Sequence, residues 1–140
     1  MKNITIPSEN GELSLTVTGR SNDSWYDVEV HAQVQRFEAR HGICLMSDDF
    51  VWLYDKLVTL QNEREAYLKN EPTKKAVFVA TEEELGITVY YSTEELGKIV
   101  WECCIQSMYT GTSLTFSLKT YLDDLDVIIS QVKDVIDHLS

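Results

Sequence analysis

The sequence is poor in basic residues, in cysteine and in proline. Among its 140 residues there are 12 Lys and Arg, 3 Cys and 2 Pro. An odd number of cysteines without a recognisable spacing argues against a disulfide framework and indicates reduced thiols. No run approaches the ~20 apolar residues of a membrane span, and the amino terminus lacks the apolar stretch of a signal peptide. We therefore expect a cytoplasmic protein that does not bind membranes.

Catalytic and metal-binding motifs are missing as well. His31, His41 and His138 lie far apart in the chain, and no His-x-x-x-His or Cys-x-x-Cys pair is present to start a zinc site. The 6 glycines form neither a Gly-x-Gly-x-x-Gly nor a Walker motif. The basic residues are too scattered for a nucleic-acid surface. We expect no enzyme activity, no cofactor, no metal and no nucleic-acid partner.

Acidic residues, in contrast, are abundant. There are 23 Asp and Glu, which gives a formal net charge of -11. Such a surface repels nucleic acid and anionic membranes, and it attracts basic partners through long-range electrostatic steering. The simpler explanation is that the charge only keeps the protein soluble, and the sequence leaves both explanations open.

Length and patterning predict one α+β domain over residues 1–140. The segments 13–18, 25–34, 37–45, 76–81, 87–91, 99–106 and 114–118 alternate apolar and polar residues, as half-buried strands do. Around Gln35 and Arg36 the alternation slips by one residue, which a bulge or a hairpin turn would explain. The alternation in all of these segments predicts an antiparallel sheet of about six or seven strands, because the strands of a doubly covered parallel sheet would be continuously apolar. No linker, internal repeat or low-complexity tract is visible.

Two amphipathic helices complete the predicted fold. Ser47 is a plausible N-cap for the first helix, and Thr120 for a second one that extends to Leu139. We expect both helices on one face of the sheet, in a two-layer sandwich whose other face is open to solvent. The predicted shared core comprises Leu53, Leu57, Trp101, Phe116, Leu125, Ile129 and Val132.

The order of these elements, with three local sequences, carries a family resemblance. The sequences are Ser47 to Phe50 at the start of the first helix, Gly97 to Glu102, and Leu114 to Leu118 before the last helix. Over residues 13–139 the chain resembles the WapI-type immunity proteins, which are small acidic bacterial proteins encoded beside polymorphic toxins. The resemblance implies a cytoplasmic binding protein that neutralises a toxin domain, and it implies no catalytic residues.

The candidate partner-binding residues are the acidic and aromatic positions that folding should leave exposed. One set is expected on the open sheet face and the other in two nearby turns; together they are Asp27, Glu29, Tyr90 and Glu102, with Glu82, Glu83, Glu84, Glu94 and Glu95. We predict that an acidic surface occludes a basic toxin domain, with Tyr90 as an aromatic anchor. Simple packing of Tyr90 against its cross-strand neighbours is an equally good explanation of that residue.

The alternative function is a structural or regulatory domain that assembles with copies of itself, so a homo-oligomer is left open. A small enzyme is the least favoured of the three hypotheses, because no triad, dyad or cofactor motif is present.

Overall fold

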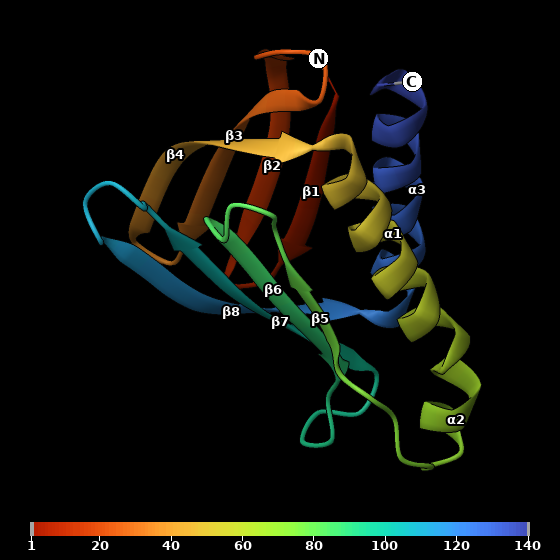
Figure 1. The fold of residues 1–140 in the computed structure, drawn as a ribbon. Helices are drawn as coiled ribbons and strands as arrows, with labels where there is room; N and C mark the ends of the chain where they lie inside the picture. The colour runs from red at the N-terminus through yellow and green to blue at the C-terminus, as the bar shows by residue number, and fades with distance from the viewer. Residues whose placement is uncertain (1, 140) are drawn as a thin grey trace.

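The computed structural model describes residues 2–139, which form eight strands and three helices (Figure 1). The first half contains β1 (Asn3–Ser8), β2 (Gly11–Arg20), β3 (Trp25–Val34), β4 (Phe37–Met46), α1 (Ser47–Asn62) and the short α2 (Arg64–Leu68). The second half contains β5 (Ala76–Val79), β6 (Leu85–Tyr91), β7 (Lys98–Gln106), β8 (Ser113–Tyr121) and α3 (Leu122–Leu139).

The strands form two antiparallel sheets of four strands each, in the orders β1-β2-β3-β4 and β5-β6-β7-β8. The prediction of a single sheet of six or seven strands is therefore wrong. Short hairpins pair consecutive strands within each half, whereas α1, α2 and the loop 69–75 separate β4 from β5. The alternation of side chains reports which face of a strand is buried, but it does not report which strand lies beside it.

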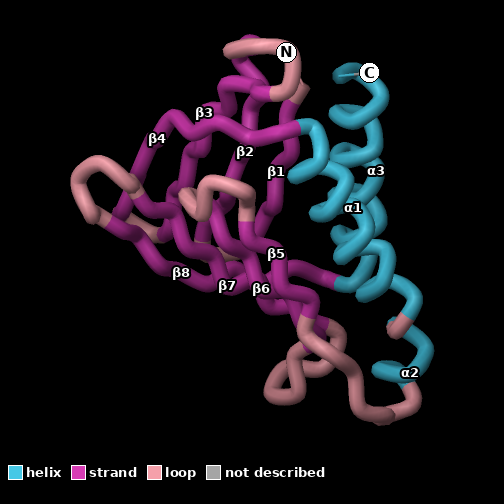
Figure 2. The backbone as a smooth tube through the Cα atoms, viewed as in Figure 1, coloured by secondary structure: helices cyan, strands magenta, loops and turns pink. Residues whose placement is uncertain are grey.

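The sequence predicted that both helices cover one face of a single sheet, and the structure differs from this prediction. Helices α1 and α3 run side by side along one side of the molecule, with the two sheets on the other (Figures 1 and 2). Helix α3 packs along β1, and α1 packs beside β5. The predicted core is confirmed as one cluster, to which both sheets and helices α1 and α3 contribute side chains. Phe116 is partly buried in it, and the other six predicted residues are buried.

Each half of the chain has the same plan, four antiparallel strands followed by a helix. The amino-acid sequence shows no corresponding repeat. Strand and helix periodicities tolerate many different apolar residues, so two halves can share an architecture without sharing a recognisable sequence.

The slip in alternation near Gln35 is a hairpin turn. Val34 pairs with Phe37, and Gln35 takes a positive φ of 55° between the two strands. The turn of two residues reverses the chain. The side chains that point into the core are therefore at even positions in β3 and at odd positions in β4.

Both helix starts differ from the prediction by one or two residues. Ser47 is the first residue of α1, with Met46 as the N-cap, and the backbone N–H of Met46 donates to Asp49 Oδ2 at 2.8 Å. Thr120 lies in β8, where its hydroxyl accepts a hydrogen bond of 2.9 Å from Trp101 Nε1. Ahead of α3 the N–H of Tyr121 donates to Asp124 Oδ2 at 2.9 Å, so the third residue of the helix hydrogen-bonds back to the residue before it, as the acidic residue of a capping box does.

Candidate partner-binding surfaces

The predicted binding residues fall into two groups. Asp27 and Glu29 lie on β3 in the first sheet, whereas Tyr90 and Glu102 lie on β6 and β7 in the second. The single sheet face that was predicted to carry all four therefore does not exist. Asp27 and Glu29 instead line one depression together with Glu82 and Glu84, and Tyr90 lines another together with Glu94. Glu102 lines neither of them.

The first depression, which we call the acidic depression, has a volume of about 580 Å³. It lies between the exposed side of β3 and β4 and the turns β5–β6 and β7–β8, and its charged or aromatic lining residues are Asp27, Glu29, Arg40, His41, Glu82, Glu84 and Tyr109. Four carboxylates face one guanidinium, so the lining carries a net charge of -3 when His41 is neutral. Glu83 is exposed in the same turn as Glu82.

Neighbouring side chains orient the carboxylates on β3. Arg40 Nη1 on β4 donates to Glu29 Oε1 at 2.9 Å, and the Cys44 thiol lies 3.7 Å from Asp27 Oδ1. The Ser21 hydroxyl also donates to Asp27. Because β3 is paired on both sides, by β2 and β4, these acids sit on rigid backbone rather than on a loop.

Glu84 is not the solvated turn residue that the sequence suggested. It is 7% exposed, and its Oε2 lies 2.9 Å from Nε2 of the half-buried His41. The contact joins the β5–β6 turn of the second sheet to β4 of the first. Glu84 therefore holds the two walls of the acidic depression together, while Glu82 and Glu83 remain exposed at its rim.

Sequence reasoning missed the most exposed aromatic residue near this site. Tyr109, in the β7–β8 turn, is 95% exposed and lines the acidic depression, and the exposed Met108 precedes it. The local sequence Tyr109-Thr110-Gly111-Thr112 predicts only a polar turn. One signal could have identified Tyr109. It is an aromatic residue in a Gly-containing turn, where no strand partner is available for it to pack against.

The second depression, of about 640 Å³, is walled by tyrosines. We call it the tyrosine depression, and its lining includes Tyr67, Glu71, Lys75, Tyr90, Tyr91, Glu94 and Lys119. Two carboxylates oppose two ammonium groups there, so the lining has no net charge. It lies at the Tyr91 end of β6, about 20 Å from Glu84 at the other end, since a strand rises ~3.3 Å per residue.

Tyr90 is engaged by its own chain. The Lys75 ammonium lies 4.3 Å from the centre of its ring, and the hydrogen bond with the Glu102 carboxylate raises the pKa of the Tyr90 phenol. Glu95, expected among the exposed acids, pairs with Lys119 at 2.9 Å. The contacts of Tyr90 favour packing as its role, and the equal numbers of acidic and basic side chains in the lining leave the tyrosine depression without net charge.

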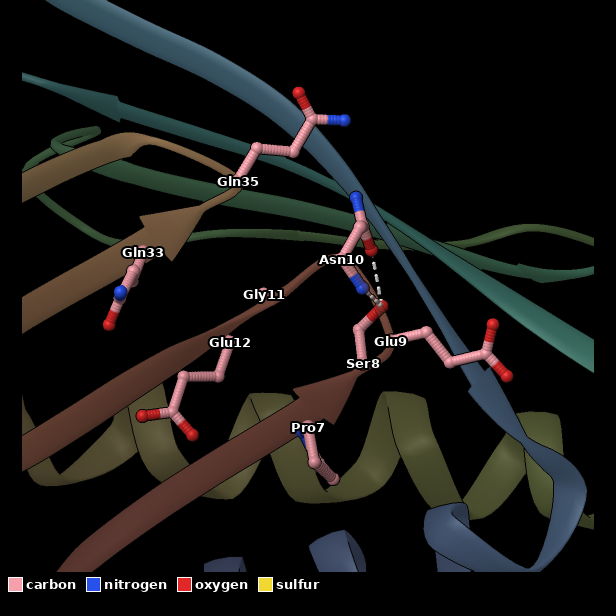
Figure 3. A pocket seen from close by; sticks show the side chains of 8 residues that line it. All are labelled: Pro7, Ser8, Glu9, Asn10, Gly11, Glu12, Gln33 and Gln35. Atoms are coloured by element: carbon pink, nitrogen blue, oxygen red, sulfur yellow. Dashed lines mark hydrogen bonds between the residues drawn. The ribbon is translucent and has the colours of Figure 1, made fainter.

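A third hollow, at the β1–β2 turn, is structural (Figure 3). Asn10 Nδ2 donates to the Ser117 carbonyl at 3.2 Å, and the Lys119 backbone N–H donates to Ser8 Oγ at 3.2 Å, so the turn clamps β8. Gly11 is required here, because a Cβ at this position would lie 2.0 Å from the Gln33 carbonyl oxygen. The side chains of Ser8 and Asn10 are therefore already used within the fold.

The structure also bears on the expected absences. Among residues 2–139 no group of three or more His, Cys, Asp or Glu side chains is arranged to hold a metal ion. Within the same range no helix is long and apolar enough to cross a membrane. The described part of the chain thus combines two antiparallel sheets, a pair of core helices and an acidic depression in a small α+β domain.

Residues 4–140 match the Immunity protein WapI-like family. Because the match spans nearly the whole chain, this protein belongs to that family, as the local sequences had suggested. Membership supports an immunity function and implies that the partner is a toxin protein. Members of such a family are generally not catalysts.

Curated protein sequences offered no match to this chain. Among solved structures, the fold is similar to a chain in "Crystal structures of Trypanosoma bruciei MRP1/MRP2", with a TM-score of 0.53. The two chains are 8% identical, and the similarity covers 97% of this chain and 83% of the other. At that identity the comparison concerns the fold alone.

Proposed function

We propose that this protein is a non-catalytic immunity protein that neutralises a cognate bacterial toxin domain by occluding its active surface with the acidic depression. The partner is a basic domain, for example a nuclease whose active site accepts phosphates. Binding takes place in the cytoplasm of the cell that makes both proteins. The observation that carries the proposal is the convergence of Asp27, Glu29 and Glu82 on one depression with net charge -3, beside an aromatic that folding leaves free.

Charge decides between the two depressions. A basic partner is attracted to the acidic depression, whereas the balanced charges of the tyrosine depression offer it no net attraction. Complementary charge mainly speeds association, and desolvated aromatic anchors supply much of the retained affinity. We therefore assign steering to Asp27, Glu29, Glu82 and Glu83, and the anchor role to Tyr109 in place of Tyr90.

The arrangement of the walls suits occlusion. Asp27 and Glu29 stand on a central strand, and the His41–Glu84 contact holds the opposing turn against β4. The Gln106 side chain donates to the Glu83 carbonyl at 2.6 Å, which further ties that turn to β7. A site held in this way loses little conformational entropy when a partner binds.

The test is binding to the product of the neighbouring toxin gene, measured at low and high salt by surface plasmon resonance. Association should slow as salt screens the acidic surface. Tyr109→Ala should weaken binding by about 30-fold, the effect of losing a hot spot of roughly 2 kcal/mol. Neither the Tyr109 nor the Glu82 side chain makes a polar contact within residues 2–139, so Tyr109→Ala and Glu82→Lys should fold normally.

The matched control is Glu94→Lys, which makes the same change of charge in the tyrosine depression. It should leave the association rate close to that of the wild type, whereas Glu82→Lys should lower it. If Glu94→Lys weakens the complex and Glu82→Lys does not, the binding surface is the tyrosine depression. If the neighbouring product does not bind at all, the proposal of toxin neutralisation is wrong.

A further inference from the structure

Gly42 is a glycine that the conformation of β4 does not require. Its φ lies outside the left-handed region, and a Cβ at this position would meet no heavy atom within 4 Å. Strands β3 and β4 pair without a bulge along their whole length. A glycine inside a strand weakens it, and one that no bulge or tight bend explains marks a place where another molecule approaches the backbone closely.

The missing side chain leaves a gap in the acidic depression, which we call the Gly42 notch. Gly42 is exposed and lines the depression, on the same face of β4 as the side chains of Arg40 and Cys44. Across the ladder Gly42 pairs with Glu29, and Cys44 pairs with Asp27. The notch therefore has a floor of backbone, and two carboxylates of β3 lie along one side of it.

The carboxylates beside the notch are only partly neutralised by the protein itself. Arg40 pairs with Glu29 at 2.9 Å and with Glu38 at 3.4 Å, so two acids share its one charge. Within residues 2–139 the side chain of Asp27 contacts neutral partners only, a serine hydroxyl and a cysteine thiol. The notch thus lies beside negative charge that a further cation can neutralise.

We propose that an arginine side chain of the toxin domain enters the Gly42 notch and bridges Asp27 and Glu29. The inference rests on the proposed function, and it names the group that the acidic depression recognises. The two acids are two residues apart on one strand, so their side chains leave the same face about 7 Å apart. A guanidinium has five donors in a flat fork and can bond two such carboxylates at once, whereas an ammonium is a point charge. Its flat face can lie over the Gly42 peptide because no Cβ separates them.

Filling the notch tests the proposal, with the purified product of the neighbouring toxin gene as the probe. Gly42→Ala and Gly42→Thr place increasing bulk where the guanidinium would lie, and they should weaken toxin binding by about tenfold and about 100-fold. Both variants should unfold at the wild-type urea concentration or above it, because glycine is the poorer strand former.

Gly86→Ala is the matched control. Gly86 lies inside β6 and lines neither depression, and a Cβ there would meet only the Phe78 carbonyl oxygen, at an ordinary distance of 3.9 Å. This variant makes the same substitution within a strand, away from the proposed contact. It should therefore bind the toxin as the wild type does.

A double-mutant cycle locates the positive charge. Asp27→Asn should weaken binding by about tenfold in the wild type and have no further effect in Gly42→Thr, because both changes remove the same contact. On the toxin, replacing the exposed arginines one at a time by alanine should find one whose effect is likewise absent in Gly42→Thr.

Each part of the proposal can fail separately. If folded Gly42→Thr binds the toxin as tightly as the wild type, or if neither Gly42 variant folds, the notch is not a contact site and the inference is wrong, while the proposed function stands. Additive effects of Asp27→Asn and Gly42→Thr would place the cation elsewhere. If a lysine of the toxin and no arginine passes the cycle, the assignment of a guanidinium is wrong. A wild type that does not bind the toxin would overturn the proposed function together with this inference.

Discussion

Replacing Asp49 is the most informative single test of how this fold is held together. Asp49 is fully buried in the first turn of α1. Its carboxylate accepts hydrogen bonds from the backbone N–H of Met46 at 2.8 Å, the backbone N–H of Thr81 at 3.0 Å and the Thr81 hydroxyl at 2.8 Å. It thereby joins the start of α1 to the chain segment that leads into the β5–β6 turn and its acidic residues.

The cost of Asp49→Asn follows from these contacts. The Asn carbonyl can still accept from one side, but its NH₂ group then faces a donor on the other, so one or two hydrogen bonds to a charged acceptor are lost. Each such bond is worth roughly 1.5–3 kcal/mol. We expect Asp49→Asn to lower the free energy of unfolding by about 2–4 kcal/mol, a large part of the ~5–15 kcal/mol of a typical domain.

The assay is urea unfolding followed by circular dichroism, with Asp48→Asn as the matched control. Asp48 is the neighbouring exposed acid, so its replacement removes only a helix-terminal charge worth ~0.3–1 kcal/mol. If the two variants lose the same stability, or Asp49→Asn loses less than about 1 kcal/mol, the buried carboxylate does not hold the turn to the helix and the argument fails.

Three further predictions concern the core, the thiols and a surface ion pair. Leu57→Ala should lower the free energy of unfolding by about 2–5 kcal/mol in the same assay, because Leu57 is fully buried in the shared core. Burial raises the pKa of the Cys103 thiol to about 12. Iodoacetamide at mildly alkaline pH should therefore modify the half-buried Cys104 and spare Cys103 in the native protein. Mass spectrometry that finds Cys103 labelled first would contradict this prediction. The hydrogen bond from Arg64 lowers the pKa of Asp126, so the pair stabilises the fold above the ordinary aspartate pKa and this contribution disappears as the pH falls through the lowered value. Asp126→Asn should therefore cost at most ~1 kcal/mol at neutral pH, because the carboxylate is half exposed, and nothing measurable in strong acid; an equal loss at both pH values would show that the ion pair is not responsible.

Much of the fold could be predicted from the sequence because the relevant signals are local. The alternation in Ile87, Val89 and Tyr91 places these side chains in the core, and all three are buried. The three- and four-residue spacing from Leu125 to Val132 predicts a helix with one apolar face, which α3 presents to the core. The charge of -11 and the family resemblance likewise depend only on residue types and their order.

The candidate site was predicted less well. Asp27, Glu29, Glu82 and Glu83 are exposed as expected, but Glu84 is buried against His41, which lies 43 positions earlier in the chain. No pattern in the sequence around Glu84 indicates that partner. Tyr109 was overlooked because turn chemistry predicts the path of the backbone, and it does not predict which side chain is left without neighbours.

The sequence by itself thus determined the buried faces of the seven predicted strands and the two long helices, the net charge and the family resemblance. Strand β1, whose Ile4 and Ile6 are buried, was not among those seven strands. Only the tertiary structure decided that the strands form two sheets, with Asp27 and Glu29 on one and Tyr90 and Glu102 on the other. The physical reason is the range of the interactions. Side-chain periodicity follows from the geometry of a few consecutive residues. Strand partners, and the distance between two exposed acids, depend on contacts between segments that the intervening helices separate in the sequence.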